Sequence, residues 1–315
     1  MNALLLAISQ ANPDAWAARF RKLAPARPIR IWPDDIGDPA DVAYVCAWKA
    51  PHGLLASFPN LKVILSLGAG VDHLMADPSL PDVPIVRFVD PDLTMRMREY
   101  VVLHVLMHHR RQRLYDAQQS RHVWREHDQP AASEVGVGIM GLGVLGHDAA
   151  ESLQRIGFRV AGWSRTKREL AGIETFHGTE GLDAFLARTE ILVCLLPHTP
   201  STEEILNLSL FRKLKRDGAL GGAYLINAGR GRLQVDADIL AALDEGSLAG
   251  ATLDVFPVEP LPPESDLWKH PNITITPHNA AVSVPAALVE NVLQQIERFE
   301  AGLPLAHVVD RTAGY

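Results

Sequence analysis

The sequence predicts an α/β protein of two domains, each built on a parallel β-sheet. Its 315 residues are enough for two hydrophobic cores. Short apolar runs alternate with helical patterns along the chain, as they do around parallel sheets. One of these runs ends in a glycine-rich turn that leads directly into a helical pattern, which is the order found in doubly wound sheets.

Composition and charge narrow the partners that we expect. The chain is 47% hydrophobic and 21% charged, which is ordinary for a soluble globular protein. A formal net charge of -7 without a long basic run argues against nucleic acid as a partner. The first apolar run, Leu4–Ile8, is too short for a signal peptide, and no run is long enough for a membrane span. Cys46 and Cys194 lie in apolar runs, so we expect reduced, buried thiols in a cytoplasmic protein.

The first hundred residues predict a small parallel sheet. Its strand-like runs are Leu4–Ile8, Ile29–Trp32, Val42–Cys46, Val63–Leu67 and Ile85–Phe88, and the helical or turn segments between them include Asp14–Leu23 and Gly53–Ser57. The glycine-rich loop Leu67–Asp72 suits either an anion or a plain turn. Trp48 follows the third strand, where it could line a pocket, although a lone Trp is more often a packing residue.

A long helical pattern runs from Met97 to about Ala117. His104 and His108 are four residues apart on this pattern and can share a helix face. Because no carboxylate or cysteine accompanies them, we expect no metal site.

The second domain is organised around Gly141-x-Gly143-x-x-Gly146, which precedes the helical pattern His147–Ile156. Gly141 allows a tight turn, Gly143 lets the backbone approach a pyrophosphate, and Gly146 lets the helix pack close to the strand. The helix N-terminus offers free N–H groups to the phosphates. The motif in this context predicts a dinucleotide site, the alternative being a purely structural turn.

The next strand, Phe158–Trp163, is not followed by the acidic residue that binds the ribose hydroxyls in NAD-binding folds. The residues that follow are Ser164, Arg165, Thr166 and Lys167. Two cations and two hydroxyls suit a 2′-phosphate better than a ribose diol. We therefore expect NADPH to be preferred over NADH, the alternative being an ordinary basic surface turn.

Later strands of this domain end in polar loops. The runs are Glu190–Leu196, Ala223–Asn227, Ala249–Val255 and Ile273–Ile275. Because the carboxyl ends of parallel strands meet at one edge, three of these loops offer Arg230, Glu259 and His278 to one place. An Arg between glycines has room for an anion, and a His oriented by a carboxylate can exchange a proton near neutral pH. Together they predict a catalytic site.

The combined motifs resemble the D-isomer-specific 2-hydroxyacid dehydrogenases, and within them the glyoxylate/hydroxypyruvate reductase A branch. The segments that carry this resemblance are GLGVLG, NAGRG, DVFPVEPLPPESDLW and TPHNAA, supported by GAGVD, WSRT and the C-terminal VDR and GY. The family implies two Rossmann-like domains with a cleft between them and crossovers near Glu99 and Ser283. Residues 1–99 with 284–315 would form a flavodoxin-like substrate domain, to which a final helix, Val284–Ala301, returns. Residues 100–283 would form a doubly wound cofactor domain.

The resemblance also implies roles for individual residues. Arg230 would bind the substrate carboxylate and carbonyl, His278 would be the acid/base, and Glu259 would pair with it. The substrate-binding set would be Trp48, Ala69, Gly70, Arg230 and His278. The cofactor-binding set would be Gly141, Gly143, Val144, Leu145, Gly146, Ser164, Arg165, Thr166, Lys167, Leu196, Pro197, Thr202, Ala228, Asp254, His278 and Ala280.

The implied reaction is NADPH-dependent reduction of a small 2-oxo acid, glyoxylate to glycolate or hydroxypyruvate to D-glycerate, by a homodimer joined through its cofactor domain. One alternative is a different reaction on the same fold. A formate dehydrogenase relative would carry Gln in place of Glu259, because its reaction needs no proton transfer, so Glu259 argues against that alternative. A nucleotide-sensing, corepressor-like regulator would keep the fold and the triad, but the chain has no long disordered tail or basic arm to support that alternative.

Overall fold

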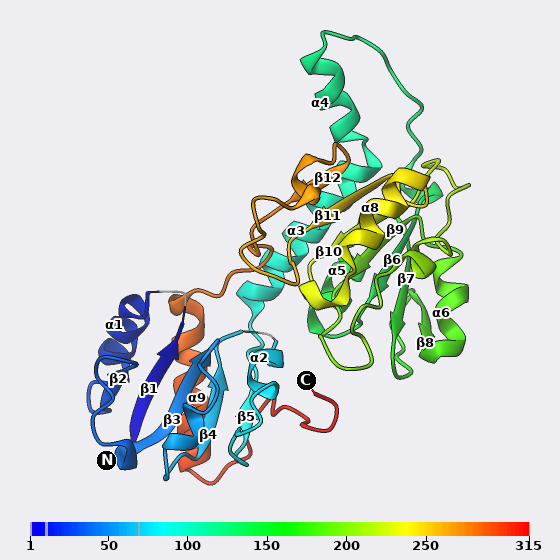
Figure 1. Ribbon diagram of the computed structural model, residues 1–315. Helices are drawn as coiled ribbons and strands as arrows, with labels where there is room; N and C mark the ends of the chain where they lie inside the picture. The colour runs from blue at the N-terminus through cyan, green and yellow to red at the C-terminus, as the bar shows by residue number, and fades with distance from the viewer. Residues whose placement is uncertain (1, 10–11, 69, 315) are drawn as a thin grey trace. The chain divides into compact units, whose positions relative to one another are not determined.

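The computed structural model describes residues 2–9, 12–68 and 70–314, and it divides the chain into two compact units (Figure 1). Unit 1 comprises Met1–Leu93 and Val282–Tyr315, and unit 2 comprises Thr94–Ala281. Each unit contains its own parallel sheet, so the predicted α/β class with two sheets is confirmed.

The sheet of unit 1 has the strand order β2-β1-β3-β4-β5, in which every pairing is parallel. The strands are β1 (Ala3–Ile8), β2 (Ile29–Ile31), β3 (Val42–Trp48), β4 (Val63–Ser66) and β5 (Ile85–Val86). This is the flavodoxin-like order, which reverses direction between β1 and β3. The prediction that the third strand stops at Cys46 is wrong, because β3 pairs with β1 as far as Trp48. Trp48 therefore lies at the end of a strand that borders the switch point.

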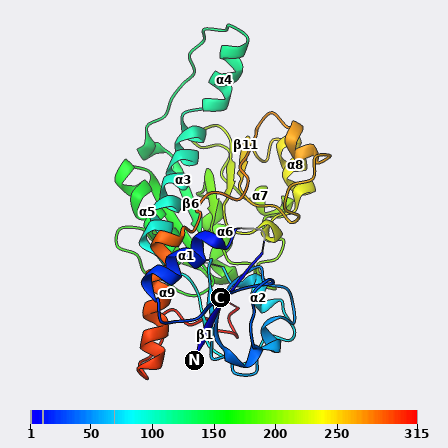
Figure 2. The same cartoon turned by 90° about the vertical axis from the view of Figure 1, so that its left-hand side faces the viewer.

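The C-terminal helix completes unit 1. The helices here are α1 (Asp14–Leu23), α2 (Asp72–Met75) and α9 (Pro285–Glu300), with the 3-10 turns η1 (Pro39–Asp41) and η2 (Leu55–Ser57). Helix α9 lies beside α1 (Figure 2). Arg19 Nη2 of α1 donates to Glu290 Oε1 of α9 at 2.5 Å, and Tyr44 OH of β3 donates to Glu300 Oε1 at 3.1 Å. Helix α9 therefore packs on the elements of the N-terminal part of unit 1.

The sheet of unit 2 has the order β12-β11-β10-β9-β6-β7-β8, again with parallel pairings throughout. The strands are β6 (Gly136–Met140), β7 (Arg159–Ser164), β8 (Glu174–His177), β9 (Ile191–Cys194), β10 (Tyr224–Asn227), β11 (Gly250–Leu253) and β12 (Ile273–Ile275). The order reverses between β6 and β9, and a doubly wound sheet binds ligands beyond the carboxyl ends of strands at such a point. The glycine turn follows β6, so it lies at that edge.

Unit 2 contains six helices and three 3-10 turns within its described residues. They are α3 (Pro91–His109), α4 (Gln112–Ser120), α5 (Val144–Ile156), α6 (Gly178–Leu186), α7 (Leu208–Phe211) and α8 (Asp236–Glu245), with the 3-10 turns η3 (Ala132–Glu134), η4 (Gly231–Leu233) and η5 (Asp266–Lys269). Both views show α4 standing away from the sheet of its own unit (Figures 1 and 2).

Two predicted helices have different bounds in the structure. The single helix expected from Met97 to about Ala117 is wrong: α3 begins at Pro91, ends at His109 and is separated from α4. Arg111 precedes α4 with a φ of 55°, and such a left-handed residue interrupts a right-handed helix. The helix after the glycine turn begins at Val144 rather than His147, with Gly143 at its N-cap.

The histidines of α3 lie in the core of unit 2. His108 Nε2 is 3.0 Å from Thr252 Oγ1 of β11. Burial, together with the smaller effects of His104 and Arg113, lowers the pKa of His108 to about 3, so His108 is neutral. Burial also lowers the pKa of His104. Among the described residues, no group of three or more His, Cys, Asp and Glu side chains could hold a metal ion.

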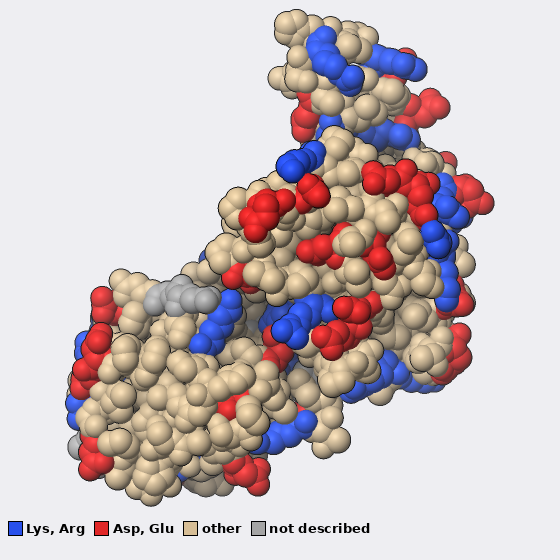
Figure 3. Space-filling model, in the orientation of Figure 1, with Lys and Arg blue, Asp and Glu red and all other residues tan. Residues whose placement is uncertain are grey.

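Acidic and basic side chains are interspersed over the face of unit 2 that Figure 3 presents. Exposed ion pairs of unit 2 include Arg212 with Glu245 at 2.7 Å and Lys213 with Asp183 at 2.6 Å. These side chains are exposed, and such pairs contribute little to stability. Within the described residues, no helix combines the length and apolarity that a membrane crossing needs.

Candidate active site

The glycine turn after β6 leaves room for a ligand at one of its three positions. Gly141 has a φ of 106°, and a Cβ there would lie 2.8 Å from Leu195 O. A Cβ at Gly146 would overlap Gly141 O, so α5 can approach the strand only with glycine at this position. Gly143 faces open space, with nothing within 4 Å of the place a Cβ would take. The N–H groups of the first turn, at Val144 and Leu145, have no acceptor within the helix, and this cradle fits a pyrophosphate.

The predicted 2′-phosphate residues lie at the end of β7. Ser164 is the last residue of the strand, and its Oγ donates to Thr166 O at 2.7 Å. Arg165 and Thr166 are exposed. Lys167 Nζ lies 3.0 Å from Glu169 Oε1, and both side chains are exposed. The turn therefore presents Arg165 and Thr166 at the ligand edge, while Lys167 shares its charge with a nearby carboxylate.

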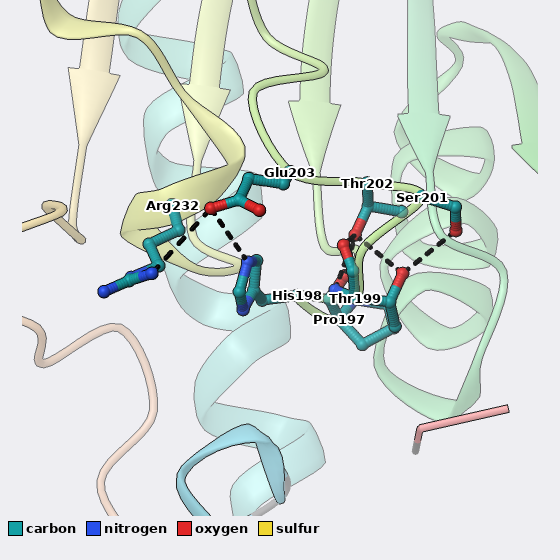
Figure 4. Close-up of polar contacts among 7 residues, drawn as sticks. All are labelled: Pro197, His198, Thr199, Ser201, Thr202, Glu203 and Arg232. Atoms are coloured by element: carbon teal, nitrogen blue, oxygen red, sulfur yellow. Dashed lines mark hydrogen bonds and ion pairs between the residues drawn. The ribbon is translucent and has the colours of Figure 1, made fainter. Parts of the chain in front are cut away.

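The loop after β9 is ordered by its hydroxyl groups (Figure 4). Thr202 Oγ1 donates to Pro197 O at 2.8 Å and accepts from Thr199 N at 2.8 Å. Thr199 Oγ1 lies 3.0 Å from Ser201 Oγ. Leu196, at the start of the loop, is buried. The predicted contacts Leu196, Pro197 and Thr202 thus belong to one turn, which Thr199 completes.

The same loop contacts the turn that follows β10. Glu203 Oε1 lies 3.9 Å from His198 Nε2 and 3.8 Å from Arg232 Nη1 (Figure 4). The backbone joins the two segments more closely, because Glu204 N donates to Arg232 O at 2.9 Å. None of these residues was singled out from the sequence. They connect the two loops that lie beyond neighbouring strand ends.

Arg230 is held by the turn that begins at Asn227. Asn227 is fully buried; its Oδ1 accepts from Gly229 N at 3.1 Å, and its Nδ2 donates to Arg230 O at 3.2 Å. Arg230 Nη1 donates to Gly229 O at 2.8 Å, and the side chain is half-buried. Next to it, a Cβ at Gly231 would overlap the carbonyl of Phe256. The turn that carries Arg230 therefore packs directly against the loop that follows β11. Ala228, a predicted cofactor contact, is buried within this turn.

The structure brings His278 and Glu259 together. His278 Nδ1 lies 2.8 Å from Glu259 Oε2, and the other carboxylate oxygen accepts from Phe256 N at 3.1 Å. The His278 side chain is 35% exposed and that of Glu259 is 22% exposed. Because a carboxylate accepts hydrogen bonds, Nδ1 carries a proton and Nε2 remains for a substrate.

Asp254 follows β11 and holds the loop that carries His278. Its side chain is 1% exposed. Oδ1 accepts from Asn279 N at 2.9 Å, and Oδ2 accepts from Ala280 N at 3.0 Å. Its backbone oxygen accepts from His278 N at 2.8 Å. Asp254 and Ala280, both predicted cofactor contacts, are thus joined by a hydrogen bond.

In unit 1, Trp48 packs onto the glycine-rich loop. A Cβ at Gly68 would overlap the Trp48 ring, and that ring meets His73 edge-on with centroids 5.4 Å apart. Ser66 Oγ donates to Gly70 O at 3.4 Å. Ala69, a predicted substrate contact, lies outside the described residues. Because the Trp48 ring lies so close, position 68 has no room for a residue larger than glycine.

Comparisons with known proteins agree on one family. Residues 102–280 match the family model of the D-isomer specific 2-hydroxyacid dehydrogenase NAD binding domain. A glyoxylate/hydroxypyruvate reductase A of Yersinia enterocolitica is 41% identical over 306 residues, which are 95% of this chain and 96% of that protein. The structure of an NADPH-dependent glyoxylate/hydroxypyruvate reductase of Sinorhizobium meliloti, in complex with NADP and sulfate, is 50% identical with a TM-score of 0.95 over 100% of both chains. A D-isomer specific 2-hydroxyacid dehydrogenase of Xanthobacter autotrophicus, in complex with NADPH and MES, is 41% identical with a TM-score of 0.94 over 100% of this chain and 99% of that one.

Proposed function

This chain belongs to the D-isomer specific 2-hydroxyacid dehydrogenase family, and on that premise we propose that it reduces small 2-oxo acids with NADPH. Its substrates are glyoxylate, which becomes glycolate, and hydroxypyruvate, which becomes D-glycerate. The observation that carries the proposal is the 2.8 Å contact between His278 Nδ1 and Glu259 Oε2, at the same sheet edge as the glycine turn.

His278 is the acid/base of the proposed reaction. With Nδ1 directed at Glu259, protonated His278 donates from Nε2 to the carbonyl oxygen of the 2-oxo acid as that oxygen gains charge. The Glu259 carboxylate stabilises the imidazolium that this step requires, and Phe256 N holds the carboxylate in place. In the reverse direction, neutral Nε2 accepts the proton of the hydroxy acid.

Arg230 anchors the substrate. Its guanidinium binds the substrate carboxylate through charge-assisted hydrogen bonds and stabilises charge on the carbonyl oxygen. As substrate contacts from unit 1 we propose Trp48, Ala69 and Gly70, because backbone N–H groups of a glycine-rich loop suit an anion such as a carboxylate.

The dinucleotide fits the glycine turn, where Gly143 faces open space at the N-terminus of α5. When bound, its nicotinamide supplies the hydride. The residues that would hold it are Gly141, Gly143, Val144, Leu145, Gly146, Ser164, Arg165, Thr166, Lys167, Leu196, Pro197, Thr202, Ala228, Asp254, His278 and Ala280. We assign residues 100–283 to the cofactor domain, and residues 1–99 with 284–315 to the substrate domain.

Replacing Arg165 with alanine is expected to raise the KM for NADPH about ten- to a hundredfold and to leave that for NADH nearly unchanged. The lost interaction is a hydrogen bond to a charged phosphate, worth roughly 1.5–3 kcal/mol. Steady-state kinetics with both cofactors measure the effect. Arg168→Ala, which removes an exposed arginine of the same turn, is the matched control and should leave the preference unchanged.

An Arg165→Ala protein that loses activity equally with both cofactors would contradict this assignment. So would a wild-type protein that prefers NADH.

The proposed function is tested by assaying purified protein with glyoxylate, hydroxypyruvate and pyruvate, each with NADPH and with NADH. We expect turnover of the first two with NADPH. A protein that binds NADPH but turns over none of the acids would instead fit a nucleotide-sensing regulator.

We also propose that the protein is a homodimer joined through unit 2. The segment after α4 exposes Val123 by 45% and Trp124 completely, and an interface is the usual place for an aromatic side chain that no neighbour covers. Light scattering should give about twice the chain mass of 34.5 kDa, and Trp124→Ser should lower it toward one chain. Trp268→Ser, which replaces another exposed Trp, is the control and should leave the measured mass unchanged. A monomeric wild-type mass would refute the proposal.

We propose a cytoplasmic location because the two cysteines are free thiols. Cys46 and Cys194 are free and buried, and burial raises the pKa of both thiols. Unreactive, reduced thiols suit a reducing compartment.

A further inference from the structure

The loop that carries His278 is held from both sides by one buried carboxylate. Asp254 Oδ1 accepts from Thr276 Oγ1 at 2.6 Å, two residues before His278. The same carboxylate accepts from Asn279 N at 2.9 Å and from Ala280 N at 3.0 Å, directly after it. His278 therefore lies between two anchor points on a single side chain.

His278 needs these anchors because its backbone is in a disfavoured conformation. Its φ is 52°, in the left-handed region, which residues with a Cβ rarely adopt. His278 N donates to Asp254 O at 2.8 Å and to Thr276 O at 3.1 Å. If the flanking bonds were lost, the backbone could relax toward ordinary angles and would turn the imidazole away.

Tyr100 of α3 completes this network. Its hydroxyl lies 2.8 Å from Thr276 Oγ1. Thr276 gives its own proton to the Asp254 carboxylate, so Tyr100 is the donor in this contact. The Tyr100 side chain is buried, and burial raises its pKa, although the bond to Thr276 opposes the shift. Tyr100 therefore keeps its proton and fixes the orientation of the Thr276 hydroxyl.

We propose that Thr276 and Tyr100 are positioning residues for the reaction: through Asp254 they hold His278 in the orientation from which it exchanges a proton with the substrate. This inference rests on the proposed function. Neither residue belongs to the predicted cofactor or substrate sets. The network also joins the segment that enters unit 2 at Thr94 to the segment that leaves it after Ala281.

The first test is kinetic. Thr276→Val removes the bond to Asp254 and should lower kcat about tenfold, the fold-change expected for one hydrogen bond to a charged acceptor. The KM for the 2-oxo acid should stay close to wild type, because Thr276 does not contact the substrate. Thr276→Ser, which keeps the hydroxyl, should restore kcat. Tyr100→Phe should lower kcat about threefold, and adding it to Thr276→Val should cause little further loss, because the two act in series.

The second test asks whether the effect passes through His278. In a His278→Ala background, Thr276→Val should cause no further loss of kcat. An equal tenfold loss in both backgrounds would overturn the inference, as would failure of Thr276→Ser to restore activity.

Thr252→Val is the matched control. Thr252 is buried, lies on β11, and contacts His108 of α3 at 3.0 Å, but it is not bonded to the His278 loop. We expect it to lower the melting temperature about as much as Thr276→Val does while leaving kcat unchanged. A fall in kcat equal to that of Thr276→Val would mean that stability alone explains the kinetic loss.

The third test needs no activity. Hydrogen exchange of the Asn279 and Ala280 amides in the cofactor-free protein should become about tenfold faster in Thr276→Val and should not change in Thr252→Val. Unchanged exchange in Thr276→Val would overturn the inference. If the wild type turned over no 2-oxo acid, the proposed function would fail, and the exchange experiment would still decide whether Thr276 holds this loop.

Discussion

Replacing His278 with alanine is expected to lower kcat for 2-oxo acid reduction by roughly 10²–10⁴, the range for loss of a positioned general acid. The proposed proton donor is then absent, and the Glu259 carboxylate that lies 2.8 Å from its Nδ1 has no group to orient. The measurement is kcat at saturating NADPH and substrate.

Binding of NADPH should change little in this variant, and fluorescence titration of the cofactor checks that. His177→Ala is the matched control, because His177 ends β8 with an exposed side chain and should leave kcat unchanged. Wild-type turnover by His278→Ala would remove His278 from the proton-donor role.

Arg230→Lys is the second large effect, although it keeps the positive charge. Lysine cannot reproduce the planar, multi-donor contacts of guanidinium. The expected loss in transition-state stabilisation is roughly 2–5 kcal/mol, the range for losing a partner of a buried charge. This corresponds to a fall in kcat/KM of about 30-fold to several thousandfold.

Arg232→Lys provides the comparison two residues away. Arg232 is exposed, and its Nη1 lies 3.8 Å from the nearest Glu203 oxygen, so the change should leave kcat/KM near wild type. Near-normal kcat/KM in Arg230→Lys would mean that Arg230 does not bind the substrate.

The fold was predictable where local chemistry determines it. The glycine turn after β6 was predictable from its motif. A left-handed φ at Gly141 and a close approach at Gly146 exclude other residues at these two positions. Apolar runs such as Ile191–Cys194 are buried on both faces and are recognised from composition alone. These signals do not depend on contacts far along the chain.

Elements determined by distant contacts were not predictable. Strand β8 has the polar sequence Glu174–His177 and exists because it pairs with β7. The break between α3 and α4 occurs at Arg111, a residue type that carries no signal for a left-handed turn. In both cases tertiary context overrides local propensity.

The candidate site shows the same division. Residues that would touch a ligand follow strand ends, so Arg230, Glu259 and His278 could be identified by position. The network behind His278 could not. Tyr100 and Thr276 are 176 residues apart, and nothing in the sequence distinguishes Tyr100 from the other buried residues of α3. Asp254 acts largely on backbone amides, which leave no mark in the sequence.

The return of α9 to unit 1 has a consequence during synthesis. The first 93 residues leave the ribosome early, but the helix that packs beside α1 is made only after unit 2, which is continuous from Thr94 to Ala281. About 190 residues separate the two parts of unit 1, which corresponds to roughly 10–40 s of translation at 5–20 residues per second. During that interval unit 2 can fold as a whole, while the apolar surface of the nascent N-terminal part of unit 1 is not yet covered by α9. The domain that is translated first is therefore the last to be completed, and its uncovered surface is where a chaperone would bind.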